Sequence, residues 1–146
     1  VLFIGYAAAT IPFAYAIAAL LRNDFSTWIV RSYRWTLFTM TSLGIGIFLG
    51  GYWAYKVLGW GGYWGWDPVE NSSLIPWIVL VALMHGMIVQ RRRGALVRTN
   101  IALALLSFIL VFYSTFLTRS GVLSDFSVHS FSDLGLSRHL IFFMLF

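Results

Sequence analysis

The feature that most constrains this sequence is a series of long apolar runs separated by short polar loops. Four runs approach or reach the roughly 20 residues that a helix needs to cross a hydrocarbon core of ~30 Å. They cover residues 1–21, 35–57, 74–90 and 96–117, and a fifth begins near Leu140. Nothing alternates with a period of two, as the strands of a membrane barrel would. The sequence therefore predicts an all-α, polytopic transmembrane helix bundle with four spans and a truncated fifth.

Composition supports this class and narrows the chemistry. Only 10% of the residues are charged and 60% are apolar, whereas about a quarter of the residues of a soluble domain are charged. The chain has no cysteine, which excludes disulfides, thiolate metal sites and cysteine nucleophiles. Because Val1 and Phe146 both fall inside apolar runs, we expect residues 1–146 to be part of one transmembrane domain, truncated at both ends.

The basic residues indicate an orientation in the membrane. Seven arginines fall in two loops on one side: Arg22, Arg31, Arg34, Arg91, Arg92, Arg93 and Arg98. Only Lys56, Arg119 and Arg138 fall on the other side, so the positive-inside rule assigns the first set to the cytoplasm. The loops at about 58–73 and 118–137 are then extracytoplasmic. The net charge of +5 is a topology signal and not the footprint of nucleic-acid binding.

The first of these loops contains a dense aromatic cluster in the segment GWGGYWGWDPVENSSLIPW. Its rings are Trp60, Tyr63, Trp64, Trp66 and Trp77, interleaved with glycines that let a flat ligand approach closely. The alternative is an aromatic belt at the membrane interface, where tryptophan is common. Asp67-Pro68 ends the cluster, and we expect Ser72 or Ser73 to cap the next helix, with Pro76 in its first turn.

The cluster resembles a known motif. WGGYWGWDP fits the W-G-x-x-W-x-W-D pattern of the haem-handling WWD-domain family, and the continuation VENSSLIPW is similar to that of its CcmF-type cytochrome c haem lyases. The segments LFIGYAAATIPFA and TFLTRSGVLSDFSVHSF also resemble this branch, so the resemblance covers nearly the whole chain.

The resemblance implies a role in cytochrome c biogenesis at the bacterial cytoplasmic (inner) membrane, with both loops in the periplasm. Such proteins take haem from a membrane-anchored haem chaperone and attach its vinyl groups to the CxxCH thiols of apocytochrome c, together with thiol-handling subunits. It also implies a second, intramembrane haem b. Two alternatives stay open: a haem exporter that delivers haem to a chaperone without ligation, and a structural membrane subunit whose tryptophans are anchors.

The histidines are the candidate axial iron ligands. His85 lies inside the third run, where an ionisable residue is usually functional, although it can also bond a neighbouring helix. The resemblance makes His85 a ligand of the intramembrane haem b and His129 a ligand of the incoming haem, whereas a lone loop histidine is usually only solvated. His139 is expected at the membrane interface. The family's partner histidines lie outside residues 1–146.

Two further side chains, Asp67 and Arg119, complete the predicted haem-binding set. Asp67 belongs to the motif and is expected to bond backbone amides that fix the loop, with Glu70 packing the turn. Arg119 is expected either to pair with a haem propionate, because a guanidinium matches a carboxylate, or to anchor the end of its helix at the membrane interface. No residue is assigned as a catalytic acid or base.

Overall fold

The computed structural model describes residues 1–59, 62–131, 135 and 137–145, and every regular element in these residues is a helix. The elements are α1 (Leu2–Ala8), α2 (Thr10–Arg22), α3 (Trp28–Trp53), the π-helix η1 (Ala54–Leu58), α4 (Pro68–Arg93), α5 (Val97–Arg119) and α6 (Ser137–Leu145). Within the described residues, four helical stretches are long and apolar enough to cross a membrane: Leu2–Arg22, Trp28–Leu58, Pro68–Arg93 and Val97–Arg119. The predicted all-α, multi-span architecture is confirmed.

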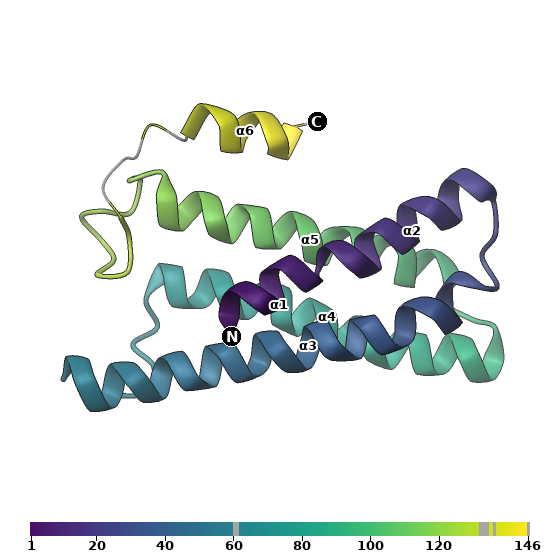
Figure 1. Cartoon of the computed structure of the whole chain (residues 1–146), viewed down its shortest axis with the longest axis horizontal. Helices are drawn as coiled ribbons and strands as arrows, with labels where there is room; N and C mark the ends of the chain where they lie inside the picture. The colour runs from purple at the N-terminus through teal and green to yellow at the C-terminus, as the bar shows by residue number, and fades with distance from the viewer. Residues whose placement is uncertain (60–61, 132–134, 136, 146) are drawn as a thin grey trace.

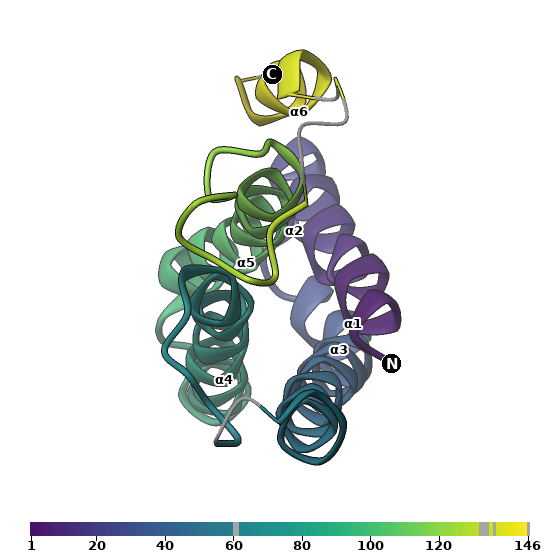
Figure 2. The ribbon, with the colours of Figure 1, turned by 90° about the vertical axis from the view of Figure 1, so that its left-hand side faces the viewer.

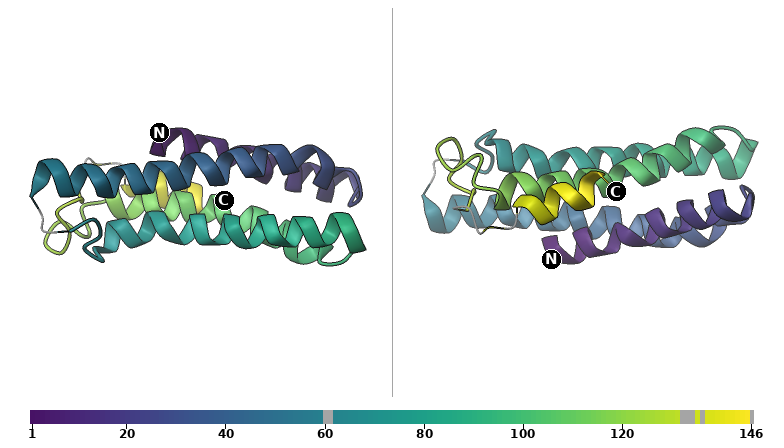
Figure 3. Two further views of the ribbon diagram at one scale, coloured as in Figure 1. Left: turned by 90° about the horizontal axis from the view of Figure 1, so that it is seen from below. Right: turned by 90° about the horizontal axis from the view of Figure 1, so that it is seen from above.

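The helices lie side by side along the long axis of the molecule (Figure 1). The loops that follow η1 and α5 lie at one end, here called the Trp-loop end, and the α2–α3 and α4–α5 turns lie at the other, the arginine-rich end (Figure 3). Seen along the axis, α1 and α3 stand opposite α4 and α5, while α6 lies outside α5 (Figure 2). The two loops predicted to share a face are therefore at the same end of the bundle.

The first span is divided near Pro12. Proline has no backbone N–H and displaces the carbonyl four residues earlier, which is that of Ala8. The hydroxyl of Thr39 on α3 lies 3.0 Å from the Ala8 oxygen and 2.8 Å from the Trp35 oxygen, so its proton is shared between the two carbonyls. A neighbouring helix therefore satisfies the carbonyl that the proline frees.

Small residues allow α1 and α3 to pack backbone against backbone. A methyl group on Gly46 of α3 would lie 2.7 Å from the Cα of Leu2, and one on Gly5 of α1 would lie 2.7 Å from the Cα of Leu43. Such close contacts are typical of membrane helices, where small residues let helices approach. By contrast, a methyl group on Gly50 would meet nothing within 4 Å.

The third predicted span begins earlier than expected. The sequence interpretation placed the helix start at Leu74 with a serine cap, but α4 begins at Pro68 with Asp67 as its N-cap. Asp67 and Glu70 form a complete capping box around Pro68 at the first helical position, a stronger start signal than Ser72 or Ser73. Pro76 is consequently inside the helix and not in its first turn.

The other ends differ by smaller amounts. Helix α3 starts at Trp28 and not near residue 35, because the stretch that carries Arg31 and Arg34 is helical although too polar to count as a membrane run. Helix α5 extends to Arg119, and α6 begins at Ser137 and not near Leu140. Hydropathy therefore located the spans but not the helical turns that extend beyond the apolar region.

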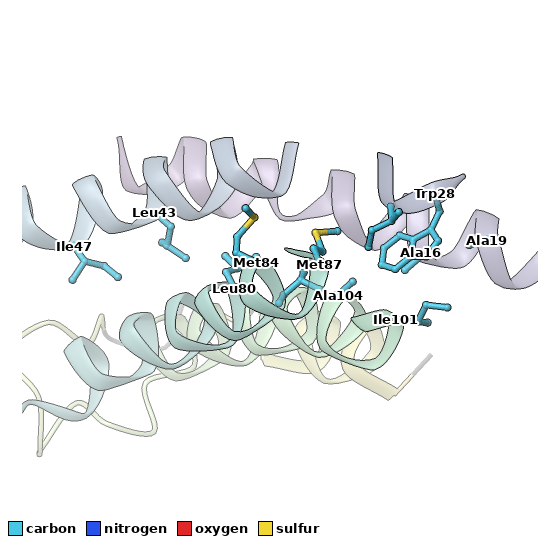
Figure 4. Close-up of a cluster of buried hydrophobic side chains, with 12 residues drawn as sticks. Ala16, Ala19, Trp28, Leu43, Ile47, Leu80, Met84, Met87, Ile101 and Ala104 are labelled. Atoms are coloured by element: carbon cyan, nitrogen blue, oxygen red, sulfur yellow. The ribbon is translucent and has the colours of Figure 1, made fainter. Parts of the chain in front are cut away.

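An apolar cluster fills the centre of the bundle, with Leu43, Leu80, Leu83 and Met87 completely buried (Figure 4). Hydrogen bonds between polar groups join the helices at both ends of this cluster. Asn100 of α5 donates to the Gln90 side chain at 2.8 Å, and the Gln90 amide donates to the Phe25 carbonyl at 3.3 Å.

Towards the Trp-loop end, a chain of hydroxyl groups joins three helices. Ser72 donates to the Val69 carbonyl at 2.7 Å, so the Ser114 hydroxyl 2.9 Å away donates to Ser72. The Tyr6 hydroxyl, 2.7 Å from Ser114, then donates to Ser114. This chain fixes α1, α4 and α5 relative to one another directly beside the candidate functional site.

The α1–α3 contact yields a prediction with an internal control. Replacing Gly46 by alanine adds a methyl group against the α1 backbone, which cannot move without separating the helices. We expect Gly46→Ala to destabilise the purified protein by about 1–3 kcal/mol, the usual cost of overpacking. Gly50→Ala should leave the thermal midpoint in detergent unchanged. Equal midpoints for the two variants would contradict the close packing of α1 on α3.

Candidate functional site

The candidate site lies at the Trp-loop end and begins with the carboxylate of Asp67. Its Oδ1 accepts the backbone N–H of Val69 at 2.8 Å and that of Glu70 at 3.4 Å. In return, the Glu70 carboxylate accepts the N–H of Asp67 at 3.3 Å and that of Gly65 at 2.8 Å. The local role expected of Asp67, bonding backbone amides to fix the loop, is confirmed.

The same carboxylate also holds the second loop. The hydroxyl of Ser127 donates to Asp67 Oδ1 at 2.7 Å, and the backbone N–H of His129 donates to the Ser127 oxygen at 3.1 Å. The His129 ring lies between two carboxylates, with Nδ1 3.3 Å from Asp67 Oδ1 and Nε2 3.9 Å from Glu70 Oε1. These contacts join segments that are 60 residues apart in the sequence. The His129 side chain is 28% exposed.

The aromatic rings of the Trp loop are ordered by contacts with one another. Trp64 and Trp66 pack edge to face, with their ring centroids 6.4 Å apart. Tyr63 stacks on Tyr55 of η1, with a centroid distance of 4.3 Å. Trp66 adopts a positive φ of 56°, and 73% of its surface is exposed. Tyr63 lines a cavity of about 440 Å³ together with Trp64 and Trp66. Trp60 lies outside the described residues.

Two larger cavities meet at this end of the bundle. The inner cavity, about 560 Å³, opens between the helices; its lining includes Tyr6, Trp53, Trp64, Arg119, His129 and Phe131. The loop cavity, about 590 Å³, opens between the two loops; its lining includes Trp64, Trp66, Asp67, Phe126, Val128 and His129. Both volumes fall in the range of small-molecule sites. Trp64 and His129 line both cavities, so either ligand position brings these two side chains into contact with the ligand.

The inner cavity is apolar except for a few directed polar groups. The indole Nε1 of Trp64 is buried and, among the described residues, has no hydrogen-bond partner. The guanidinium of Arg119 lies over the Phe131 ring, 4.6 Å from its centroid, and is held at the cavity wall in a position to meet an anionic group.

His85 is in a different part of the molecule. It lies 17 residues after Pro68, about 26 Å along α4 at 1.5 Å per residue, so it does not share a site with His129. Its side chain is exposed on the surface of the described bundle.

The hydrogen bond of His85 fixes its tautomer. Nδ1 lies 2.8 Å from the Val81 carbonyl, which can only accept, so Nδ1 carries the proton. A neutral imidazole then has its free lone pair on Nε2, as in most metal-ligating histidines whose other nitrogen is hydrogen-bonded. His139 is exposed on α6, and Trp77 serves helix packing by donating to the Met40 carbonyl at 3.1 Å.

The arrangement can hold a flat, largely apolar ligand that carries anionic groups. Aromatic rings offer stacking and edge contacts, Arg119 offers a positive charge, and His129 offers one nitrogen donor. The described residues contain no group of three side chains suited to a bare metal ion. A metal already held in a planar macrocycle needs only an axial donor, which a single histidine supplies.

Sequence reasoning missed the residues that connect the loops. Ser127 carries no signal in the sequence, because its role depends on Asp67 lying opposite it. The hydroxyl chain of Tyr6, Ser114 and Ser72 was missed for the same reason. The capping function of Glu70, in contrast, was readable from Asp-Pro-x-Glu, the spacing of a capping box.

Comparisons with known proteins give a consistent picture. The family described as "Cytochrome C assembly protein" matches residues 1–123. The "Cytochrome c-type biogenesis protein CcmF" of Pseudomonas aeruginosa is 49% identical over 134 residues, covering 90% of this chain and 20% of that protein. That of Escherichia coli (strain K12) is 44% identical over 146 residues, covering 99% of this chain and 22% of that protein.

A solved structure titled "Cytochrome c Heme Lyase CcmF" has the same fold over this segment. It superposes with a TM-score of 0.75 at 39% sequence identity and covers 99% of this chain and 23% of that chain. The chain spans about a fifth of the length of the curated relatives that it matches.

Proposed function

Because this chain belongs to the cytochrome c assembly protein family and is of the CcmF type, we propose that its Trp-loop end binds haem for attachment to apocytochrome c. The observation that carries the proposal is the meeting of Trp64, His129 and Arg119 in the lining of one cavity, although Trp64 lies more than 50 residues before the other two. The cavity volume, the aromatic lining and the single nitrogen donor all fit a haem substrate.

Each side chain has a distinct role in this proposal. His129 supplies the axial nitrogen to the haem iron, while Trp64 and Trp66 contact the porphyrin surface. Arg119, which lines the inner cavity, pairs with a propionate. Asp67 keeps the two loops together through Ser127, so that His129 and the tryptophans stay on the same ligand.

The chemistry of attachment comes from the substrates, and the protein positions them. In the proposed reaction, each cysteine thiol of a CxxCH motif adds across one haem vinyl group: a C–S bond forms, and the thiol hydrogen goes to the other vinyl carbon. The loop cavity, which opens between the two loops, is the side from which an extended peptide would reach the haem. The proposed partners are apocytochrome c, the haem chaperone and thiol-handling subunits of the same assembly system.

If His129 is the axial ligand, its replacement should have a different effect from replacing the tryptophans that line the cavities. His129→Ala should abolish cytochrome c maturation and change the spin state of bound haem, because one nitrogen makes one directional bond. Trp64→Ala should lower haem occupancy more than Trp66→Ala, since Trp64 lines both cavities and Trp66 is mostly exposed. Absorbance spectra of the purified intact protein and yields of mature cytochrome c measure these effects.

Added imidazole is the discriminating control. It should restore part of the His129→Ala activity and spectrum by filling the vacated axial position, and it should do little for the Trp variants. His139→Ala, at an exposed histidine on α6, should behave as wild type. Normal maturation by His129→Ala, or equal rescue of all variants by imidazole, would refute the assignment.

We further propose that His85 would hold a second, intramembrane haem b, whose one-electron redox chemistry would serve to keep the substrate iron reduced. Three observations support this role: His85 lies deep along α4, its side chain is exposed, and its Nδ1 is hydrogen-bonded, which leaves the lone pair of Nε2 for a metal. A partner ligand is then expected from elsewhere in the protein, because the described bundle places no second histidine beside it.

Replacing His85 separates the two haem roles. His85→Ala should remove a low-spin haem b spectrum from the purified intact protein while leaving the protein folded, since the side chain is exposed on the described bundle. His139→Ala again serves as the matched histidine control. An unchanged haem content and spectrum in His85→Ala would show that His85 is not a ligand.

We also propose that the Trp-loop end faces the periplasm and the arginine-rich end the cytoplasm of a bacterial inner membrane. Exposed serines at the two ends permit a direct test, because the sequence has no native cysteine. Ser124→Cys should react with a membrane-impermeant thiol reagent in intact spheroplasts, and Ser26→Cys should react only after lysis. The reverse labelling pattern would invert the topology.

A further inference from the structure

A second cavity of chemical interest lies at the arginine-rich end, far from the candidate haem site. This arginine cavity has a volume of about 650 Å³ and opens between the start of α3, the end of α4 and the side of α2. Its lining consists of Tyr15, Val30, Arg31, Tyr33, Arg34, Trp35, Phe38 and Arg91. Three arginines from two helices thus line a single hollow.

The three arginines have no acidic partner in the part of the chain that the structure describes. Every ion pair found there involves His129, at the opposite end of the bundle. The acidic residue of the arginine-rich end, Asp24, accepts hydrogen bonds from Ser26 and Thr27 in the turn that follows it. Hydrogen bonds from Thr27 and Ser26 lower the pKa of Asp24 to about 2, and its carboxylate is not part of the cavity lining.

The cavity changes from charged to apolar within one helical turn. Arg34 and Phe38 are four residues apart on α3, about 6 Å along the axis. Val30, Trp35 and Phe38 border the same hollow and are 62%, 45% and 47% exposed. A tryptophan beside arginines at the end of a membrane span is typical of the headgroup region, where polar and apolar surroundings meet.

The position of one arginine is fixed before any ligand arrives. The guanidinium of Arg91 lies over the Tyr33 ring, 4.6 Å from its centroid, which joins the end of α4 to the start of α3. A stacked guanidinium loses less freedom on binding an anion, and its remaining N–H groups match two oxygens of a phosphate.

From these observations we infer that the arginine cavity binds the headgroup phosphate of an anionic phospholipid, with the acyl chains along Trp35 and Phe38. The three guanidiniums neutralise the phosphate. The apolar border favours a ligand that also carries acyl chains, because free phosphate has no apolar part to contact it. Basic pockets between membrane helices bind anionic headgroups in this way. The bound lipid would join α3 to α4 at the end opposite the haem site, and the inference does not rest on the proposed haem function.

The test compares two sets of three arginines. The cavity variant is Arg31→Ala, Arg34→Ala and Arg91→Ala in the intact protein; the control is Arg22→Ala, Arg92→Ala and Arg98→Ala, which removes the same charge from the same end outside the cavity lining. Phosphatidylglycerol is added to each purified protein, and retained lipid is counted by native mass spectrometry. We expect at least about tenfold weaker retention by the cavity variant, on the scale of arginine–headgroup attraction, and near wild-type retention by the control.

A second measurement uses the unaltered protein, in case the cavity variant does not fold. Phosphatidylglycerol with a photoreactive group near the start of an acyl chain should cross-link to the peptide that contains Trp35 and Phe38. Phosphatidylcholine with the same group should cross-link much less, and millimolar inorganic phosphate should not compete. Equal losses in both triple variants, cross-links spread over the bundle, or displacement by inorganic phosphate would overturn the inference.

Discussion

The carboxylate of Asp67 is the point on which the Trp-loop end depends. Its Oδ1 caps α4 through two backbone amides and also accepts the hydroxyl of Ser127, so one oxygen both starts a helix and holds a distant loop. Without the first function α4 would lose its defined start; without the second, His129 would not be held beside Trp64. A loop that is fixed at both ends can present its aromatic rings in one arrangement, which a planar ligand requires.

The rest of the bundle supports this end through polar contacts inside an apolar core. The Tyr6–Ser114–Ser72 chain sets three helices beside the inner cavity, while Thr39 satisfies the carbonyl freed by Pro12. Because water is absent from the hydrocarbon region, such groups must find partners within the protein. The hydroxyl groups therefore determine how helices with similar apolar surfaces are positioned against one another.

The two ends of the bundle have opposite chemistry. The Trp-loop end combines aromatic rings, two carboxylates and a histidine, in accord with the proposed binding of haem. The arginine-rich end combines guanidiniums and aromatic rings without paired carboxylates, in accord with the proposed binding of a lipid phosphate. His85 lies between them, exposed on α4.

The sequence by itself determined the class of fold, the approximate spans and the family, because length, hydropathy and a contiguous motif are local properties. It also placed the aromatic loop and the His129 loop on one face. Only the tertiary structure decided that Gly5 and not Gly50 lies in a close helix contact, and that Ser127 joins Asp67 to the His129 loop. These features depend on which side chains meet across space, and a contact between residues 60 positions apart leaves no periodic or compositional trace in either segment.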